Sequence, residues 1–415
     1  MGHGVVMLLY IDPGTGSMLF TIIISVIGFL TYFFKVLWVK LKFSATKGKA
    51  GTINENRIPF LIFAESKRYW QVFRPVVREL LKREFNVVYW TTSQDDPAFE
   101  EKNDHFKVEF VGEGNKAFAK LNMVNACVIL STTPGLNVYQ WKRSKFADFY
   151  IHIMHAPTEI AGYRMFGIDY YDAILVSGQY MVDDVRVLES KRNLPAKELV
   201  LTGIPYMDEI RDRYMKEKKS DSDETTVLLA PSWGPNSIFN VFGDKVLKEL
   251  VDSGYKIIVR PHPQSFESEA ALINDIMCKY PESDKVHWDR SSDNFETLNS
   301  ADIMISDFSG VIFDYTLVFD KPVIYTDSEY KTDVYDHYWL DKERLWTFDI
   351  LEKMGTKLTN ENISDLKGLI EKSLNDKSFA EARDQARRET WVNMGEGASR
   401  TADYIIKKYN ELSKK

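Results

Sequence analysis

The chain has 415 residues, of which 44% are apolar and 27% are charged, so it has the composition of a globular protein. One hydrophobic core rarely serves so long a chain, and we expect two domains with additional segments. A formal net charge of −7 at pH 7 argues against a nucleic-acid-binding protein, because such proteins usually present a basic surface.

Residues 17–34 form an uncharged, mostly apolar stretch about as long as the shortest helix that spans a bilayer. Lysines follow it at positions 35, 40, 42, 47 and 49, with no acidic residue before Glu55. By the positive-inside rule, the chain after this stretch is cytoplasmic. We therefore expect residues 1–50 to be a membrane anchor with a basic link, in a single-pass protein of the cell membrane. A cleaved signal peptide fits less well because the positive charges follow the apolar stretch, and an interfacial helix because the stretch has no polar face.

The next part of the chain alternates between strand-like and helix-like segments. Strands are predicted at 59–64, 86–90, 106–111, 127–130, 149–154, 173–176 and 199–201, and helices at 68–85, 116–123 and 206–215. Such alternation is typical of a parallel sheet with helices on both faces. It predicts an α/β domain over residues 55–215.

A charged, serine-containing run at 216–224 is typical of a solvated connection, and the alternation then restarts. Strands are predicted at 226–230, 256–259, 286–288, 303–305 and 323–326, with helices at 244–252, 267–280, 362–374 and 379–413. We expect a second α/β domain over residues 225–385 and C-terminal helices over 386–415. Two doubly wound, Rossmann-like domains would face each other across a cleft, where ligands bind beyond the carboxyl ends of strands.

The stretch 302–326 reads as strand, tight turn, helix and strand. Ser306, Asp307 and Ser309 are suited to capping a helix start, and Gly310 lets a ligand approach the backbone closely. We expect Ser306, Asp307, Ser309 and Gly310 to belong to a substrate-binding site in which the helix end attracts phosphate, and Asp314, one turn later, to hold ribose hydroxyls. An ordinary capped helix remains the alternative.

Two histidines follow strands at corresponding places in the two predicted domains. His155 ends the strand that begins near residue 149, and His262 follows the strand at 256–259. Histidine exchanges protons near neutral pH, so this pair predicts acid–base chemistry on one substrate from two sides. The alternative is that each is a hydrogen-bonded structural histidine.

Three further residues lie near these strand ends. Arg260 is expected to neutralise a pyrophosphate or to pair with an acid. Ser232 and Trp233 are expected to line a nucleotide site, with core packing of the indole as the alternative. The chain has no P-loop, no G-x-G-x-x-G and no strand-terminal Asp-x-Asp pair, so no cofactor or metal site is predicted.

The chain has two cysteines, Cys127 and Cys278, far apart in sequence and each within an apolar or helical segment. We expect buried thiols in a reducing compartment, because the spacing fits neither a disulfide nor a zinc site.

Four motifs carry a resemblance to a known family. They are Ala-Pro-Ser-Trp at 230–233, Arg-Pro-His-Pro at 260–263, Ser-Asp-Phe-Ser-Gly-Val-Ile-Phe-Asp-Tyr at 306–315 and Gly-Ala-Ser-Arg at 397–400. In order and spacing they resemble the CDP-glycerol glycerophosphotransferases of teichoic-acid and capsule synthesis, over roughly residues 55–410. The resemblance implies a GT-B fold, donor CDP-glycerol or a related CDP-polyol in the C-terminal domain, and a lipid-linked or polymer acceptor at the membrane.

The resemblance also implies roles for particular residues. His155 and His262 match two essential histidines, and Ser309 and Asp314 match donor-contacting positions. The chain departs from the family after His155, where Ala-Pro-Thr replaces Gly-Thr-Pro, and at Tyr206, where arginine is usual. Both departures concern the acceptor more than the nucleotide.

The expected function is transfer of a polyol phosphate, most simply glycerol phosphate, to an acceptor hydroxyl with release of CMP. One alternative is a GT-B glycosyltransferase using a UDP- or GDP-sugar. The other is a non-catalytic, membrane-tethered scaffold.

Overall fold

The computed structural model describes residues 30–31, 33–34, 57–217, 224–291, 293–326, 334–340, 342 and 345–414. Its contacts divide the chain into two compact units, Met1–Arg57 and Ile58–Lys415. The predicted membrane span at 17–34 lies outside the described residues except for four positions. Among the residues that are described, no helix has the length and apolar character needed to cross a membrane.

The first sheet has seven parallel strands in the order β3-β2-β1-β4-β5-β6-β7. Its strands are β1 Ile58–Ala64, β2 Val87–Thr91, β3 Phe106–Phe110, β4 Ala126–Ser131, β5 Ala147–Ile153, β6 Ala173–Val176 and β7 Glu198–Leu201. Every residue of the central β4 is buried, as expected for a strand covered by helices on both faces.

The second sheet has six parallel strands in the order β10-β9-β8-β11-β12-β13. Its strands are β8 Thr226–Ala230, β9 Lys256–Val259, β10 Val286–Trp288, β11 Ile303–Ser306, β12 Val323–Thr326 and β13 Thr356–Leu358. The direction in which successive strands are added reverses at β8, which lies between β9 and β11. Ligands of such sheets bind beyond the carboxyl ends of the strands at this point.

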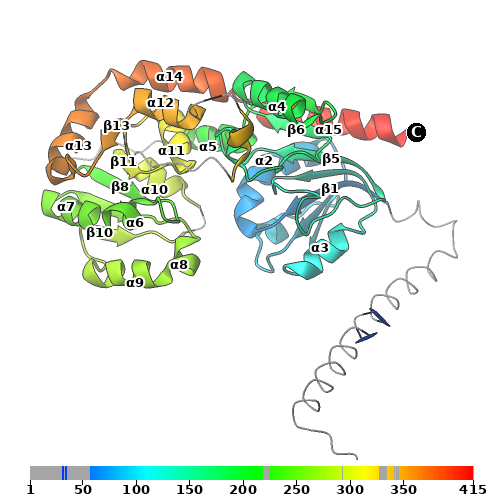
Figure 1. Cartoon of the computed structure of the whole chain (residues 1–415), viewed down its shortest axis with the longest axis horizontal. Coiled ribbons are helices and arrows are strands. Elements are labelled where there is room, and N and C mark those ends of the chain that lie inside the picture. The colour runs from blue at the N-terminus through cyan, green and yellow to red at the C-terminus, as the bar shows by residue number, and fades with distance from the viewer. Residues whose placement is uncertain are drawn as a thin grey trace, which may run out of the picture. The chain divides into compact units, whose positions relative to one another are not determined.

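Helices cover both sheets. They are α2 Trp70–Lys82, α3 Asn115–Leu121, α4 Gln179–Arg192, α5 Pro205–Lys216, α6 Ile238–Phe242, α7 Lys245–Ser253, α8 Ser265–Ser268, α9 Ala270–Lys279, α10 Phe295–Ser300, α11 Val311–Phe313, α12 Trp346–Met354, α13 Leu366–Asn375, α14 Phe379–Thr390 and α15 Gly397–Ser413. Figure 1 shows the two sheets in separate lobes, with α14 running from the second lobe towards α4 of the first. We call the part built on β1–β7 the first lobe and the part built on β8–β13 the second lobe.

The C-terminal helices join the lobes. Asp208 of α5 accepts hydrogen bonds from the backbone N–H groups of Gly395 at 2.7 Å and Gly397 at 2.9 Å, where α14 gives way to α15. Gly203 allows this crossing, because it has φ +85° and a Cβ there would lie 2.3 Å from the carbonyl oxygen of Val392. One apolar cluster consequently contains side chains of both lobes.

The structure contains elements that the sequence analysis did not predict, α12 and β13 among them, and it differs from the expectations at two further places. The helix after Gly310 is α-helical only over Val311–Phe313 and continues as a π-helical turn over Asp314–Val318. Cys278 is exposed, so the prediction that both thiols are buried is wrong for this residue. On α9 the buried residues are Ile273 and Ile276, and two residues further along a helix the side chain points to the opposite side.

Candidate active site

His155 lies just beyond the carboxyl end of β5 and is partly buried. Its Nδ1 lies 2.9 Å from Oγ1 of Thr132, which follows β4, and 3.4 Å from the hydroxyl of Tyr163. The ring of Tyr69 packs edge-on against it, with 5.4 Å between ring centroids. Because these contacts occupy Nδ1, Nε2 is the nitrogen that remains to act on a substrate.

The surroundings keep His155 uncharged. Burial, assisted by the positive charge of Arg68, lowers the pKa of His155 to about 4. Behind it, His152 is fully buried, and its Nε2 lies 3.0 Å from the same Tyr163 hydroxyl. At neutral pH the His155 ring is therefore a neutral base held in place by its neighbours.

His262 follows β9 in the second lobe. Its Nδ1 accepts a hydrogen bond of 3.1 Å from the backbone N–H of Gln264. A backbone N–H only donates, so in neutral His262 the proton resides on Nε2. Burial, again assisted by Arg68, lowers the pKa of His262 to about 4. His262 is therefore a neutral hydrogen-bond donor at Nε2.

Trp233 lies beside His262 with 6.4 Å between ring centroids, and it is 48% exposed. This exposure argues against the alternative of core packing, since a core tryptophan would be covered. The neighbouring Ser232 is buried, and its backbone N–H donates to Asp307. An open indole at a strand end is suited to stacking on a nucleobase.

The two lobes meet near His155. A Cβ built on Gly310 of the second lobe would lie 3.2 Å from Cβ of Ala156 in the first lobe. Ser309 and Gly310 are both partly buried there. The structure thus brings the residue after His155 against the turn in which the sequence predicted phosphate binding.

Two residues of that turn support the backbone and are not open to a ligand. Ser306 is fully buried and donates to the carbonyl oxygen of Ala230 at 2.6 Å. Asp307 is also fully buried, and its carboxylate accepts from the backbone N–H groups of Ser232 at 2.9 Å and Ile238 at 3.1 Å. These bonds join the ends of β8 and β11, so the expectation of direct substrate contact is corrected for Ser306 and Asp307.

Asp314 also has a protein partner. It lies in the π-helical turn, is 9% exposed, and accepts a hydrogen bond of 2.9 Å from the hydroxyl of Tyr206 on α5. Burial raises the pKa of Asp314 to about 7. In this structure the carboxyl group predicted to hold ribose instead joins the two lobes.

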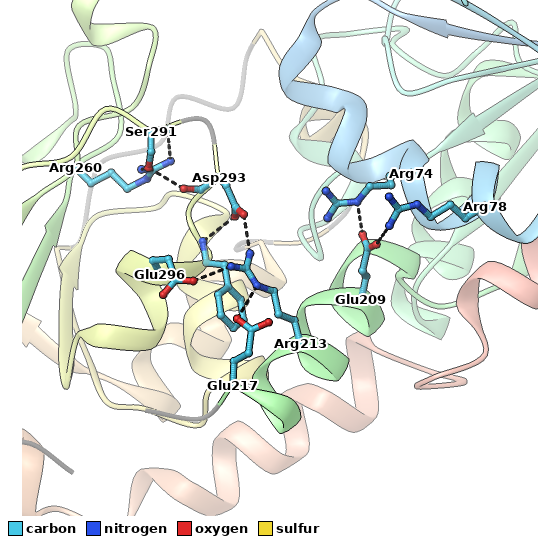
Figure 2. A network of polar contacts seen from close by, with 10 residues as sticks. Arg74, Arg78, Glu209, Arg213, Glu217, Arg260, Ser291, Asp293 and Glu296 are labelled. Atoms are coloured by element: carbon cyan, nitrogen blue, oxygen red, sulfur yellow. Dashed lines mark hydrogen bonds and ion pairs between the residues drawn. The ribbon is translucent and has the colours of Figure 1, made fainter. Parts of the chain in front are cut away.

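Arg260 pairs with an acid, the second of the two alternatives that its position left open. Its guanidinium contacts the carboxylate of Asp289. It also donates to the hydroxyl of Ser291 at 3.1 Å and to the carbonyl oxygen of Ser291 at 2.8 Å (Figure 2). Although burial acts in the opposite direction, hydrogen bonds from Ser291 and Thr297 and the charge of Arg260 lower the pKa of Asp289 to about 2. Arg260 is therefore held in a network of its own lobe.

A cavity of about 870 Å³ lies beside the site and has walls from both lobes. From the first lobe it is lined by Arg68, Arg74 and Arg78, and from the second by Arg260 and Arg290, among others. In Figure 2, Arg74 and Arg78 of α2 face Glu209 of α5. Neither His155 nor His262 lines the cavity, but Arg68 does, and its charge acts on both histidines.

Arg68 was missed by the sequence analysis, although a signal was available. It follows β1 closely, as His155 follows β5 and His262 follows β9. Carboxyl ends of parallel strands lie at one edge of a sheet. That topological rule points to the residues that follow the first strand, but it does not separate Arg68 from the neighbouring Lys67.

Comparisons with solved structures agree with this architecture. UDP-GlcNAc 2-epimerase of Methanocaldococcus jannaschii, in complex with UDP-GlcNAc and UDP, aligns with a TM-score of 0.53 at 12% identity over 84% of this chain and 99% of that one. UDP-N-acetylglucosamine 2-epimerase of Rickettsia bellii aligns with a TM-score of 0.52 at 13% identity over 86% and 98%. At such identity the likeness concerns the fold alone, which is α/β with two parallel sheets, as in GT-B glycosyltransferases.

A curated relative is similar over part of the chain. The teichoic acid glycerol-phosphate primase of Bacillus subtilis (strain 168) is 26% identical over 164 residues, which make up 37% of this chain and 39% of that protein. The match thus spans well under half of the relative.

The match to a family model covers a larger part of the chain than the match to the curated relative. The model of the CDP-glycerol:poly(glycerophosphate) glycerophosphotransferases matches residues 164–407, which include His262, the 306–315 motif, α14 and the first part of α15. This is more than half of the chain, and the protein therefore belongs to the CDP-glycerol:poly(glycerophosphate) glycerophosphotransferase family.

Proposed function

We propose that the protein transfers glycerol phosphate, or a related polyol phosphate, from a CDP-activated donor to a hydroxyl group of a lipid-linked or polymer acceptor. CMP is the second product. The observation that carries this proposal is the histidine pair. His155 and His262 follow strands of opposite lobes, and both are held neutral by burial and by one arginine.

The reaction follows from the two tautomers. The acceptor oxygen attacks the distal phosphorus of the donor, and its proton passes to Nε2 of His155. The bond between that phosphorus and the bridging oxygen breaks, and CMP leaves with the electron pair. Nε2–H of His262 donates to the leaving phosphate. Phosphoryl transfer depends mainly on positioning and charge stabilisation, so no covalent enzyme intermediate is required.

The donor side of the site lies in the second lobe under this proposal. Trp233 stacks on the cytosine, and the backbone at Ser309 and Gly310 approaches the diphosphate. Exposure of the Trp233 ring beside His262 supports the first contact. The partial exposure of Ser309 and Gly310, where the two lobes meet beside His155, supports the second. Residues 225–385 would then form the donor domain, residues 55–215 the acceptor domain and residues 386–415 the helices that join them.

The acceptor is proposed to be reached at the membrane. Residues 17–34 would anchor the chain in the cell membrane as a single span, with the catalytic lobes in the cytoplasm, because lysines follow the apolar stretch. Deleting residues 1–45 is expected to move the protein from the membrane pellet to the supernatant after ultracentrifugation. A truncated protein that still pellets with lipid would contradict a single N-terminal anchor.

The activity is tested by measuring CMP release from a panel of CDP-alcohols with a membrane lipid extract as acceptor. CDP-glycerol is expected to be turned over, with the fastest member of the panel identifying the polyol. Parallel reactions contain UDP- and GDP-sugars. Release of UDP or GDP would favour a glycosyltransferase, and no turnover of any CDP-alcohol would favour a binding scaffold. Either result would overturn the proposal.

A further inference from the structure

Arg68 is a cation at the carboxyl end of β1, in the helical turn Lys67–Tyr69. It is exposed, and its guanidinium carbon lies 6.0 Å from the ring centroid of Tyr69. The Tyr69 ring in turn packs edge-on against His155 at 5.4 Å. One aromatic ring thereby separates Arg68 from the proposed base, and Arg68 lies at the wall of the cavity shared by both lobes.

Three cations near Arg68 differ from it in having acidic partners. Lys67 contacts Asp95, Arg74 bonds to Glu209 at 2.8 Å, and Arg260 contacts Asp289. Within the described part of the chain, no carboxylate forms an ion pair with Arg68. A guanidinium left without a counter-ion beside a reaction site is available to an anionic ligand.

The charge of Arg68 also reaches both proposed catalytic groups. After burial, it is the next cause that lowers the pKa of His155 and the pKa of His262. The two histidines belong to different lobes, so this guanidinium lies within electrostatic range of both sides of the site. A cation within range of both histidines is suited to bind the phosphate on which they act in the proposed reaction.

We propose that Arg68 is a catalytic residue that binds the phosphate being transferred, donating hydrogen bonds to its non-bridging oxygens as the charge on them redistributes. This rests on the proposed function and replaces Arg260 as the cation of the reaction centre. Arg68 forms and breaks no covalent bond. The attacking hydroxyl still gives its proton to His155, and CMP still leaves with the electron pair of the broken bond. A planar guanidinium suits this role, because it offers paired donors to a phosphate and stays charged at any working pH.

The first test compares Arg68→Ala, Arg68→Lys and Lys67→Ala in the full chain, using CMP release from CDP-glycerol. Lys67→Ala is the matched control, because it removes the same charge one residue away but from an ammonium paired with Asp95. Removing one preorganised donor to a transition state typically costs about 10²- to 10³-fold in kcat. We expect that loss for Arg68→Ala, partial recovery for Arg68→Lys and less than a twofold change for Lys67→Ala. An Arg68→Ala enzyme within threefold of wild type would overturn the inference.

The second test needs no turnover. The ring protons of His155 and His262 are followed by NMR during a pH titration of wild type, Arg68→Ala and Lys67→Ala, with histidine variants providing the assignment. Removing the positive charge is expected to raise the pKa of both histidines in Arg68→Ala only. Unchanged values would overturn the inference even if wild type turned over no CDP-alcohol. A wild-type enzyme that is inactive while both values move would instead count against the proposed function alone.

Discussion

The two histidines of the site occupy matching places in the two lobes but have different neighbours. Nδ1 of His155 faces two side-chain hydroxyls, of Thr132 and Tyr163, each able to donate or to accept. Nδ1 of His262 faces the backbone N–H of Gln264, which only donates. The first environment leaves the tautomer of the ring adjustable, whereas the second allows one tautomer in the neutral state.

This difference supports the two roles proposed for the pair. A general base that takes up a proton at Nε2 must carry its own proton on Nδ1 in the neutral state, and it keeps Nδ1–H as a donor once Nε2 is protonated. The hydroxyls beside His155 can accept from Nδ1–H. His262 keeps its proton at Nε2 and suits a fixed donor to the leaving group. Under the proposal, the two lobes contribute the same residue type to opposite ends of the reaction.

The largest expected effects come from removing either ring. His155→Ala and His262→Ala are each expected to lower the kcat for CMP release by roughly 10² or more, the usual contribution of a positioned acid or base. Steady-state measurement with CDP-glycerol and lipid acceptor checks this. Near-normal release from both variants would remove the mechanism.

Glutamine variants test whether the two histidines have different roles. The side-chain amide of glutamine reaches the position of Nε2 and can donate but cannot accept a proton at pH 7. His262→Gln is therefore expected to retain more activity than His262→Ala. His155→Gln is expected to be no better than His155→Ala. Equal behaviour of the two glutamine variants would show that the roles are not divided as proposed.

The pH profile gives the next largest effect. Both rings act in the neutral form, and burial lowers the pKa of each to about 4. Activity is expected to persist as the pH falls below 6.5, the ordinary histidine value, and to be lost as it passes through about 4. Initial rates measured from pH 4 to 8 check this, with circular dichroism confirming that the protein stays folded. An acid limb near 6.5 would show that the rings are not desolvated.

The fold was largely predictable from the sequence, and the reason is visible in particular strands. β4 and β8 are short apolar runs between helical segments, and every residue in them is buried, so alternation alone predicted parallel sheets. Both histidines were found because chain order reveals which residues follow a strand. The site was less predictable where contacts join distant segments.

Asp314 illustrates this limit. Its partner Tyr206 is 108 positions away in the chain, and no local sequence pattern predicts that pair. Asp307 and Arg260 are similar cases, since the fold pairs each charge with protein groups. The sequence had placed Asp307 in the substrate site and had left Arg260 with two alternatives, a pyrophosphate or an acid. Arg68 is the converse case, a residue without a motif that tertiary structure brings to the site.

The hydrogen bond between Tyr206 and Asp314, which joins the two lobes, is expected to contribute moderately to the free energy of unfolding. Tyr206→Phe leaves the buried Asp314 carboxyl without its donor, and an unsatisfied buried group costs about 1–3 kcal/mol of unfolding free energy. Chemical denaturation at pH 7 checks this value. Asp314→Asn keeps an acceptor for Tyr206 and is the matched control, expected to lose less. A Tyr206→Phe protein as stable as wild type would show that the pair does not stabilise the junction.

The raised pKa of Asp314 makes the stability of the protein depend on pH in a known direction. Burial raises its folded-state pKa to about 7 from an ordinary value of 3.8. The folded chain thus binds the proton more tightly, and stability falls as the pH rises from about 4 to about 7. Asp314→Asn should remove this slope. An unchanged slope in denaturation curves across that range would assign the pH dependence to other groups.

The smallest effect is expected at the thiols, which again differ between the lobes. Cys127 is buried in β4 of the first lobe, whereas Cys278 is exposed on α9 of the second. Cys278→Ser is expected to change stability by less than about 0.5 kcal/mol, as for most surface substitutions.

Maleimide should label Cys278 in the native protein and Cys127 only after unfolding, because labelling requires access to the sulfur. Applied to His155→Ala in a Cys278→Ser background, the same reaction shows whether the first lobe remains folded, and rapid labelling of Cys127 would assign the loss of activity to unfolding rather than to the missing base.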